Sequence, residues 1–242
     1  MIPKNVQGLV EIIIFLLAII LLLRDNASLQ HSHNILLASM TLLSFTSQFV
    51  MFLLVIPAYS DVNLPLPVSI LLPVIYSLEV YVIVRLALIY SSKLSCGGFA
   101  LLRGKFFTSL IMGLMGGLIS TALILTYSLA YNHRFFPEQP MILMALGTGF
   151  SNLVREEVLF RLGAQTILLN ALKNYRYSGY FAVLGSAVLF EVWHNIKAIN
   201  GLNFLISLTF VILYHRYGYE ASAVAHAFGD LAVFWELPSL YL

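Results

Sequence analysis

Long apolar runs with almost no charged side chains dominate this sequence and limit the folds that it can adopt. Residues 106–131, for example, include no Asp, Glu, Lys or Arg. Over the 242 residues, 60% are hydrophobic and 10% are charged, and the mean hydropathy is +0.90. These values lie far outside the range of soluble globular domains. We therefore predict a polytopic membrane protein, which satisfies its backbone hydrogen bonds within helices rather than open strands.

The apolar runs predict an all-α bundle of about eight transmembrane helices. One crossing needs about 20 residues, so we expect a single integral-membrane domain over residues 1–242, with its chemical motifs in a core at about 141–235. The N-terminal run is expected to be a retained first span, because no small-residue cleavage site follows it closely. The last three runs are short for full spans. The predicted helices are 6–23, 35–56, 68–90, 106–131, 141–171, 180–194, 204–215 and 221–234.

The composition also limits the classes of partner that we expect for this protein. We expect a multi-pass protein of the cell membrane, in contact with membrane lipids. The net charge of +2 gives no indication of nucleic acid, and we expect no nucleic-acid partner. The single Cys96 excludes an intramolecular disulfide and any multi-cysteine zinc site.

The densest group of charges lies at residues 155–161, inside an apolar stretch. Charged side chains at membrane depth cost about 2.5–3.5 kcal/mol on insertion scales and usually mark function. Glu157 and Arg161 are four residues apart, so they share a helix face and can pair. Glu156 is rotated by about 100° from Glu157, which leaves it free to act as a general base in a low-dielectric cavity. An interhelical ion pair that only locks the bundle explains this motif alone equally well.

Two further motifs place imidazoles on later helices. His194 follows Phe190 by four residues, and Asp230 follows His226 by four, so each pair shares a helix face. Taken separately, a histidine at a helix end is more often an interface residue, and the second pair could be a buried polar clasp. Together with Glu156 they form a carboxylate–imidazole cluster suited to activating water and stabilising an oxyanion.

In order, the motifs read E-E-x-x-x-R, F-x-x-x-H and H-x-x-x-D, a pattern that resembles the CAAX protease and bacteriocin-processing family (CPBP, also called ABI). The resemblance covers about residues 141–235. The family contains glutamate-dependent intramembrane endopeptidases, including the type II CAAX prenyl endopeptidases, with a core of about eight helices. It implies an endopeptidase that uses glutamate-activated water to cleave a membrane-associated or lipidated peptide, in CAAX-type or peptide-precursor processing, without a covalent acyl-enzyme.

The resemblance also implies a role for each motif. Glu156 and His194 would activate the attacking water. His226 and Asp230 would hold the oxyanion of the tetrahedral intermediate. An ionised Asp230 cannot donate to an oxyanion, so it would have to be protonated or orient His226 instead. Three supporting residues would complete the site: Glu157, Arg161 and Phe190.

Other intramembrane protease chemistries fit the sequence less well. No H-E-x-x-H motif for a zinc protease occurs. Gly229-Asp230 lacks the partner Tyr-Asp pair of the aspartyl type, and Gly185-Ser186 lacks the surrounding context of a rhomboid serine. We expect no cofactor. Zinc is a minor alternative, with four possible ligands: Glu156, His194, His226 and Asp230.

A non-enzymatic function is the second hypothesis. A membrane scaffold or a bacteriocin self-immunity protein could use the same polar cluster for binding. The two hypotheses predict different spatial arrangements of the three motifs. Motifs that converge on one place favour the enzyme, whereas motifs that face different neighbours favour the scaffold.

Outside the motifs, the sequence has two further features, a pair of charges in an apolar run and a cluster of glycines. Glu79 and Arg85 are six residues apart on nearly opposite sides of the predicted helix 68–90, so each needs a partner elsewhere. We expect structural ties to the motif helices, with recognition of a substrate carboxylate by Arg85 as the alternative. The glycine cluster at 113–117 is interpreted as a small-residue packing surface.

Overall fold

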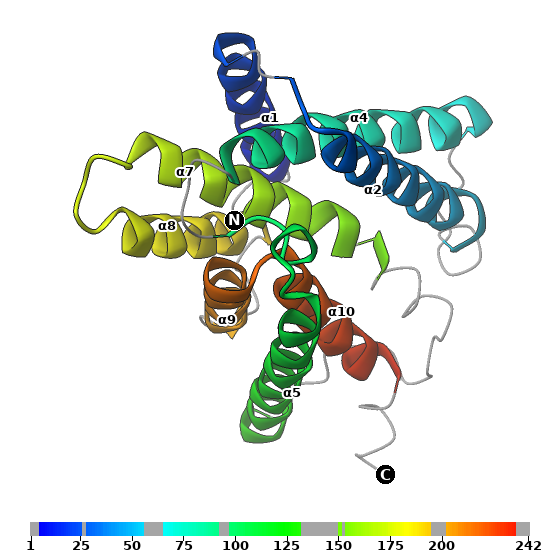
Figure 1. Cartoon of the computed structure of the whole chain (residues 1–242). Helices are drawn as coiled ribbons and strands as arrows, with labels where there is room; N and C mark the ends of the chain where they lie inside the picture. The colour runs from blue at the N-terminus through cyan, green and yellow to red at the C-terminus, as the bar shows by residue number, and fades with distance from the viewer. Residues whose placement is uncertain are drawn as a thin grey trace.

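The computed structural model describes residues 5–25, 28–55, 65–91, 97–131, 150–151, 153–194 and 202–235. Its described residues form eight α-helices and no strand (Figure 1), which confirms the all-α prediction. The α-helices are α1 (Asn5–Arg24), α2 (His31–Val50), α4 (Leu66–Ser91), α5 (Phe106–Tyr131), α7 (Thr166–Ala171), α8 (Ser178–Trp193), α9 (Leu202–Tyr217) and α10 (Tyr219–Trp235). Two π-helical segments and one 3-10 turn complete them: η1 (Met51–Val55), η3 (Val158–Gln165) and η2 (Leu101–Arg103).

Three helical segments are long and apolar enough to cross a membrane by length and composition. They are His31–Leu53, Leu66–Tyr90 and Phe106–Tyr127. Two shorter apolar helices, Ser178–Trp193 and Phe204–Tyr217, accompany them. The chain is therefore a membrane protein. Of the predicted helix 141–171, residues 141–149 lie outside the described part, and the backbone is helical without a break from 153 to 171.

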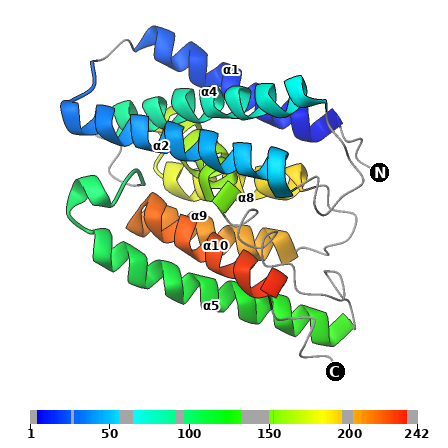
Figure 2. The same ribbon diagram turned by 90° about the vertical axis from the view of Figure 1, so that its right-hand side faces the viewer.

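The helices pack in three layers, which Figure 2 shows edge on. Helices α1, α2 and α4 form one outer layer, and α5, α9 and α10 form the other. The segment from residue 153 through η3 and α7, together with α8, lies between them and packs against α4 and α9. The motif that begins at Arg155 is therefore enclosed by helices from both ends of the chain.

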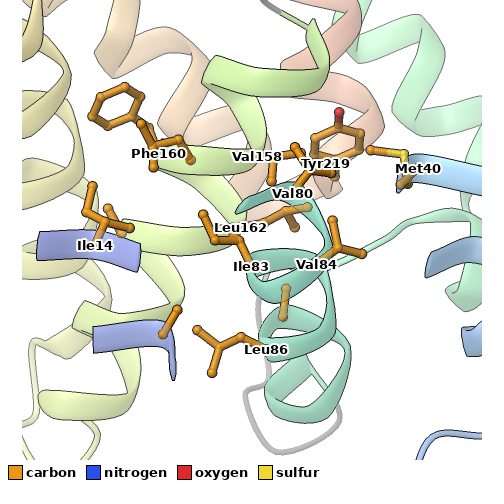
Figure 3. Packing of buried hydrophobic residues seen from close by; sticks show 14 of the residues in the cluster. Ile14, Met40, Val80, Ile83, Val84, Leu86, Val158, Phe160, Leu162 and Tyr219 are labelled. Carbon is orange, nitrogen blue, oxygen red and sulfur yellow. The ribbon is translucent and has the colours of Figure 1, made fainter. Parts of the chain in front are cut away.

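The main apolar core surrounds η3. All eight residues of this segment are buried, as expected for a helix that is covered on every side. Ile14 of α1, Ile83 of α4 and Leu162 of η3 belong to this core (Figure 3). A Cβ at Gly163 would lie 3.1 Å from Ile14 and 3.2 Å from Ile83, so the glycine allows both outer helices to approach η3 closely.

Small residues also set the contact between α5 and α10. A Cβ at Gly113 would lie 2.8 Å from the backbone oxygen of Ala221, and one at Gly117 would lie 2.7 Å from Phe228. The helices could not approach this closely with larger side chains at these positions. The predicted packing role of the glycine cluster is confirmed. This contact positions α10, which carries His226.

Candidate active site

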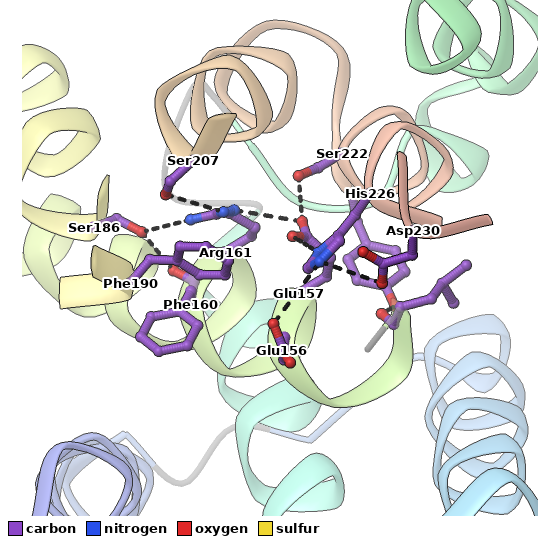
Figure 4. Close-up of polar contacts among 12 residues, drawn as sticks. Glu156, Glu157, Phe160, Arg161, Ser186, Phe190, Ser207, Ser222, His226 and Asp230 are labelled. Carbon is purple, nitrogen blue, oxygen red and sulfur yellow. Dashed lines mark hydrogen bonds and ion pairs between the residues drawn. The ribbon is translucent and has the colours of Figure 1, made fainter. Parts of the chain in front are cut away.

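The fold brings the four predicted catalytic residues together. Glu156 precedes η3, His194 caps the C-terminus of α8, and His226 and Asp230 lie one turn apart on α10. Glu156 Oε2 lies 3.5 Å from His194 Nε2 and 3.8 Å from His226 Nε2. His226 Nε2 lies 3.7 Å from Asp230 Oδ2. Figure 4 shows Glu156, from the segment that leads into η3, facing His226 and Asp230 of α10.

Glu156 places one carboxylate oxygen between the two imidazoles. Its Oε2 atom is buried and has no hydrogen-bond partner among the described residues. Both neighbouring imidazole nitrogens lie beyond the usual length of a direct hydrogen bond. Because an unpaired buried acceptor is costly, this oxygen marks the place where a bound water or substrate group would be stabilised.

His194 is held with one nitrogen free. Its Nδ1 lies 3.0 Å from the backbone oxygen of Phe190, and since a carbonyl can only accept, Nδ1 is the donor. In the neutral ring, Nε2 then carries the lone pair and faces Glu156. The Phe190 ring packs 4.1 Å from the imidazole, which confirms the contact predicted from their spacing.

His226 is fixed from two sides. Its Nδ1 lies 2.8 Å from Glu157 Oε1, so an ionised Glu157 accepts a hydrogen bond from this nitrogen. The ring stacks on Phe210 at 4.8 Å between centroids, with 23° between the planes. Together these contacts direct Nε2 toward Glu156 and Asp230. The hydrogen bond from His226 to Glu157 was not predicted from the sequence.

Glu157 and Arg161 form the ion pair that their spacing predicted. Arg161 Nε lies 3.4 Å from Glu157 Oε2, and both side chains are 0% exposed. The guanidinium also donates to Ser186 at 3.4 Å and to Ser207 at 3.3 Å. Ser222 donates to Glu157 from α10. Five residues form this closed cluster, in which the guanidinium neutralises the carboxylate and the serine hydroxyls hydrogen-bond to one or the other: Glu157, Arg161, Ser186, Ser207 and Ser222.

The serines of the closed cluster were not predicted from the sequence. Ser222 could have been found, because it precedes His226 by four residues and Asp230 by eight, so all three share one face of α10. Ser186 and Ser207 lie singly in apolar helices, and their spacing carries no comparable signal.

A π-helix follows the glutamate pair directly. A π-helical turn is wider than an α-helical one and occurs frequently at functional sites. Ser186 donates to the backbone oxygen of Phe160 at 2.9 Å, so one carbonyl of η3 gains a side-chain partner from α8. This hydrogen bond helps to hold α8 beside the glutamates.

The remaining charges near the site have partners in the N-terminal helices. Arg155 pairs with Glu11 of α1, a residue that the sequence analysis did not single out, and its charge also acts on buried Glu79 of α4. The expected structural tie of Glu79 to the motif helices stays a prediction. Arg85 donates a hydrogen bond to Tyr81 of its own helix at 3.3 Å, and its expected tie to the motif helices likewise stays a prediction.

Among the described residues, no group of three or more His, Cys, Asp and Glu side chains is arranged to hold a metal ion. The minor alternative of a zinc site on the four predicted residues gains no support from this geometry. The chemistry that the arrangement offers is that of a carboxylate and two imidazoles.

A bundle of apolar helices around a buried carboxylate that faces two oriented imidazoles defines a membrane protein with a candidate acid–base site. Residues 138–232 match a protein-family model described as type II CAAX prenyl endopeptidase Rce1-like. Across this segment the chain carries a domain of that family, which belongs to the CPBP group, and the predicted resemblance is confirmed. The family implies a CAAX-type intramembrane protease, hence a hydrolase with a peptide substrate. No curated protein and no solved structure matches the chain.

Proposed function

We propose that this protein is an intramembrane endopeptidase that hydrolyses a peptide bond in a membrane-associated or lipidated peptide. The observation that carries the proposal is the buried, unpaired Oε2 of Glu156, which faces Nε2 atoms from two other helices. Three segments that are far apart in the sequence meet at this one place, and they carry Glu156, His194 and the pair His226–Asp230. Such convergence favours an enzyme over a scaffold with separate binding patches.

Glu156 and His194 activate the attacking water in this mechanism. The carboxylate accepts a proton from water as the oxygen bonds to the peptide carbonyl carbon. His194 offers a second acceptor at Nε2, because its Nδ1 donates to Phe190. When the tetrahedral intermediate collapses, the C–N bond breaks and the captured proton passes to the leaving amine. No covalent acyl-enzyme forms.

His226 stabilises the oxyanion of the tetrahedral intermediate. Its Nδ1 already donates to Glu157, so Nε2 can donate to the oxyanion only when the ring is the imidazolium, in which both nitrogens are donors. An ionised Asp230, 3.7 Å from Nε2, then orients and balances this imidazolium rather than donating itself. Donors of this kind act strongly in a site that excludes water.

The supporting residues hold this geometry. Glu157 fixes His226, and Arg161 neutralises Glu157 inside the bundle. The Phe190 ring lies against His194 at 4.1 Å and against His226 at 6.0 Å. It thereby spaces the water-activating imidazole from the oxyanion-binding one.

We further propose that residues 1–242 form one multi-pass domain in the cell membrane, with about eight helices in the bilayer. The site then lies among helices rather than in a soluble module. A peptide substrate that is itself inserted in or attached to the membrane can reach it.

The test is proteolysis by the purified full-length protein in detergent, with a fluorogenic membrane-anchored peptide. We expect Glu156→Gln and His194→Ala to abolish cleavage and to leave folding intact. Glu220→Gln is the control, because among the described residues the Glu220 carboxylate accepts its hydrogen bonds from the N–H groups of Ala100 and Leu101. Full proteolysis by Glu156→Gln would overturn the mechanism.

The same variant separates the enzyme from the non-proteolytic scaffold or self-immunity protein. A binding function should survive Glu156→Gln in the cell, because the amide keeps the size of the side chain. An enzyme should lose its cellular effect and retain uncut substrate. Co-purification of peptides with the Glu156→Gln protein would then identify the substrate class.

A further inference from the structure

One carboxylate of the first helix contacts two residues beside the proposed active site. Glu11 Oε1 accepts a hydrogen bond from the indole Nε1 of Trp193 at 2.7 Å. Both Glu11 oxygens lie 2.9 Å from Arg155 Nη2. The three side chains come from α1, from α8 and from the helix that leads into η3.

The two partners of Glu11 are direct neighbours, in the sequence, of the proposed water-activating residues. Arg155 directly precedes Glu156, and Trp193 directly precedes His194. Glu11 therefore links the segment that carries Glu156 to the end of the helix that carries His194. Because Arg155 and Trp193 are both held by Glu11, their neighbours Glu156 and His194 are held near each other, with 3.5 Å between Glu156 Oε2 and His194 Nε2.

The contact is held in place by its surroundings. The Arg155 guanidinium lies 3.8 Å over the ring of Tyr76. The Trp193 ring packs edge-on against Phe160 at 5.7 Å and against His194 at 4.7 Å. The side chains of Glu11 and Arg155 are 18% and 19% exposed, so these charge-assisted hydrogen bonds are largely shielded from solvent.

We propose that Glu11 is a positioning residue of the active site, which sets the distance between Glu156 and His194 by holding Arg155 and Trp193. The proposal rests on the proposed function. Glu11 lies outside the segment 138–232 that matches the family model. The first helix thus contributes to the reaction geometry as well as to the apolar core.

The kinetic test compares Glu11→Gln with Asp25→Asn in the full-length protein. Asp25 follows the other end of α1 and accepts a hydrogen bond from Tyr90 of α4, away from the site. We expect Glu11→Gln to lower kcat by about 10- to 100-fold, since small displacements of catalytic groups cost rate, with KM nearly unchanged. Asp25→Asn should leave both parameters near their original values.

A double-mutant cycle tests whether Glu11 acts through Trp193. Trp193→Phe keeps the packing of an aromatic ring but removes the indole donor. If both residues serve one contact, the double variant with Glu11→Gln should lose little more kcat than either single variant. Fully additive losses would show that the two side chains act separately and would overturn the proposal.

A measurement that does not depend on proteolysis tests the Glu11 contact independently of the proposed function. The chain has two tryptophans, so Trp235→Phe protein carrying 5-fluorotryptophan gives one fluorine NMR signal, from Trp193. Glu11→Gln should shift or broaden this signal, and Asp25→Asn should not. If the protein shows no proteolysis but its Trp193 signal responds in this way, the proposed function is contradicted and the Glu11–Trp193 contact is supported. An unchanged signal, or an unchanged kcat in an active protein, overturns the positioning role.

Discussion

Two neighbouring carboxylates in this molecule have opposite surroundings. Glu157 lies in the closed cluster, where Arg161, Ser222 and His226 all contact it. Glu156, one residue earlier, has a buried oxygen without a hydrogen-bond partner among the described residues. The helix turns by about 100° per residue, so the two carboxylates point to different sides and share only His226 among these contacts.

The difference shows how a membrane protein can keep a reactive charge. In the closed cluster the charges of Glu157 and Arg161 compensate each other, and serine hydroxyls hydrogen-bond to both groups, which lowers the cost of burying them. Glu156 adjoins this cluster in the chain, and the polar groups that face its Oε2 atom are the imidazoles of His194 and His226. His226 joins the two, because Nδ1 faces Glu157 and Nε2 faces Glu156. Variants of the closed cluster should therefore affect stability, and variants around Glu156 should affect rate.

Arg161→Ala should have the largest effect on stability. It leaves the fully buried Glu157 without its cation, and breaking a buried pair in this way costs about 3–5 kcal/mol. Unfolding of the purified protein in detergent, followed by heat or by SDS titration, measures the loss. Arg155→Ala is the matched control, since that guanidinium is partly exposed and should cost clearly less. Equal stability of the Arg161→Ala and wild-type proteins would contradict the structural role of the closed cluster.

His226→Ala should affect stability and rate together, because His226 belongs to both environments. Loss of its hydrogen bond to a charged group costs about 1.5–3 kcal/mol, and loss of an oxyanion donor costs about 100- to 1,000-fold in kcat. Ser222→Ala removes another donor to Glu157 from the same helix but leaves the imidazole. It should lower stability to a similar degree and keep most of the activity. If both variants lost the same activity, His226 would be no more than a partner of Glu157.

The sequence predicted those parts of the site that depend on spacing within one helix. The pairs Glu157–Arg161, Phe190–His194 and His226–Asp230 are each four residues apart, and local helical geometry is enough to place each pair on one face. The apolar runs likewise predicted the described helices closely, because about 20 apolar residues are needed for each crossing. The run 106–131, for example, coincides with α5.

Contacts between helices could not be predicted in this way. The pairing of Arg155 with Glu11 joins positions 144 residues apart, and no periodicity within either helix records it. The π-helical geometry of η3 has no signature in the pattern of apolar residues. The serines around Arg161 depend on which faces of α8 and α9 meet, which is a property of the packed bundle.

Gly117→Ala should have an intermediate effect through the α5–α10 contact. The new Cβ would lie 2.7 Å from Phe228 Cβ, and overpacking of this kind typically costs about 1–3 kcal/mol. Gly229→Ala is the matched control on the facing helix, because its Cβ would meet nothing closer than 3.7 Å. Replacing that helical glycine should leave stability unchanged or raise it by about 0.4–1 kcal/mol.

Thermal unfolding measures both glycine variants, and kcat shows whether the displaced α10 disturbs His226. Equal stability of the two variants would show that α5 and α10 can separate without cost. The close approach would then be unimportant for positioning the site.

Asp230→Asn should have the smallest effect, and it tests the side of the site that faces Glu156. An ionised Asp230 balances the His226 imidazolium, whereas an asparagine amide has no charge but can donate a hydrogen bond to the oxyanion. The two changes oppose each other, so we expect kcat to change by less than about 10-fold, equivalent to about 1.4 kcal/mol. Asp230→Ala removes both contributions and should lose more. The ratio of the Asn and Ala rates on the fluorogenic peptide therefore measures what position 230 contributes. A loss of all cleavage in Asp230→Asn would mean that the carboxylate itself takes part in proton transfer, which would assign Asp230 to the base rather than to the oxyanion site.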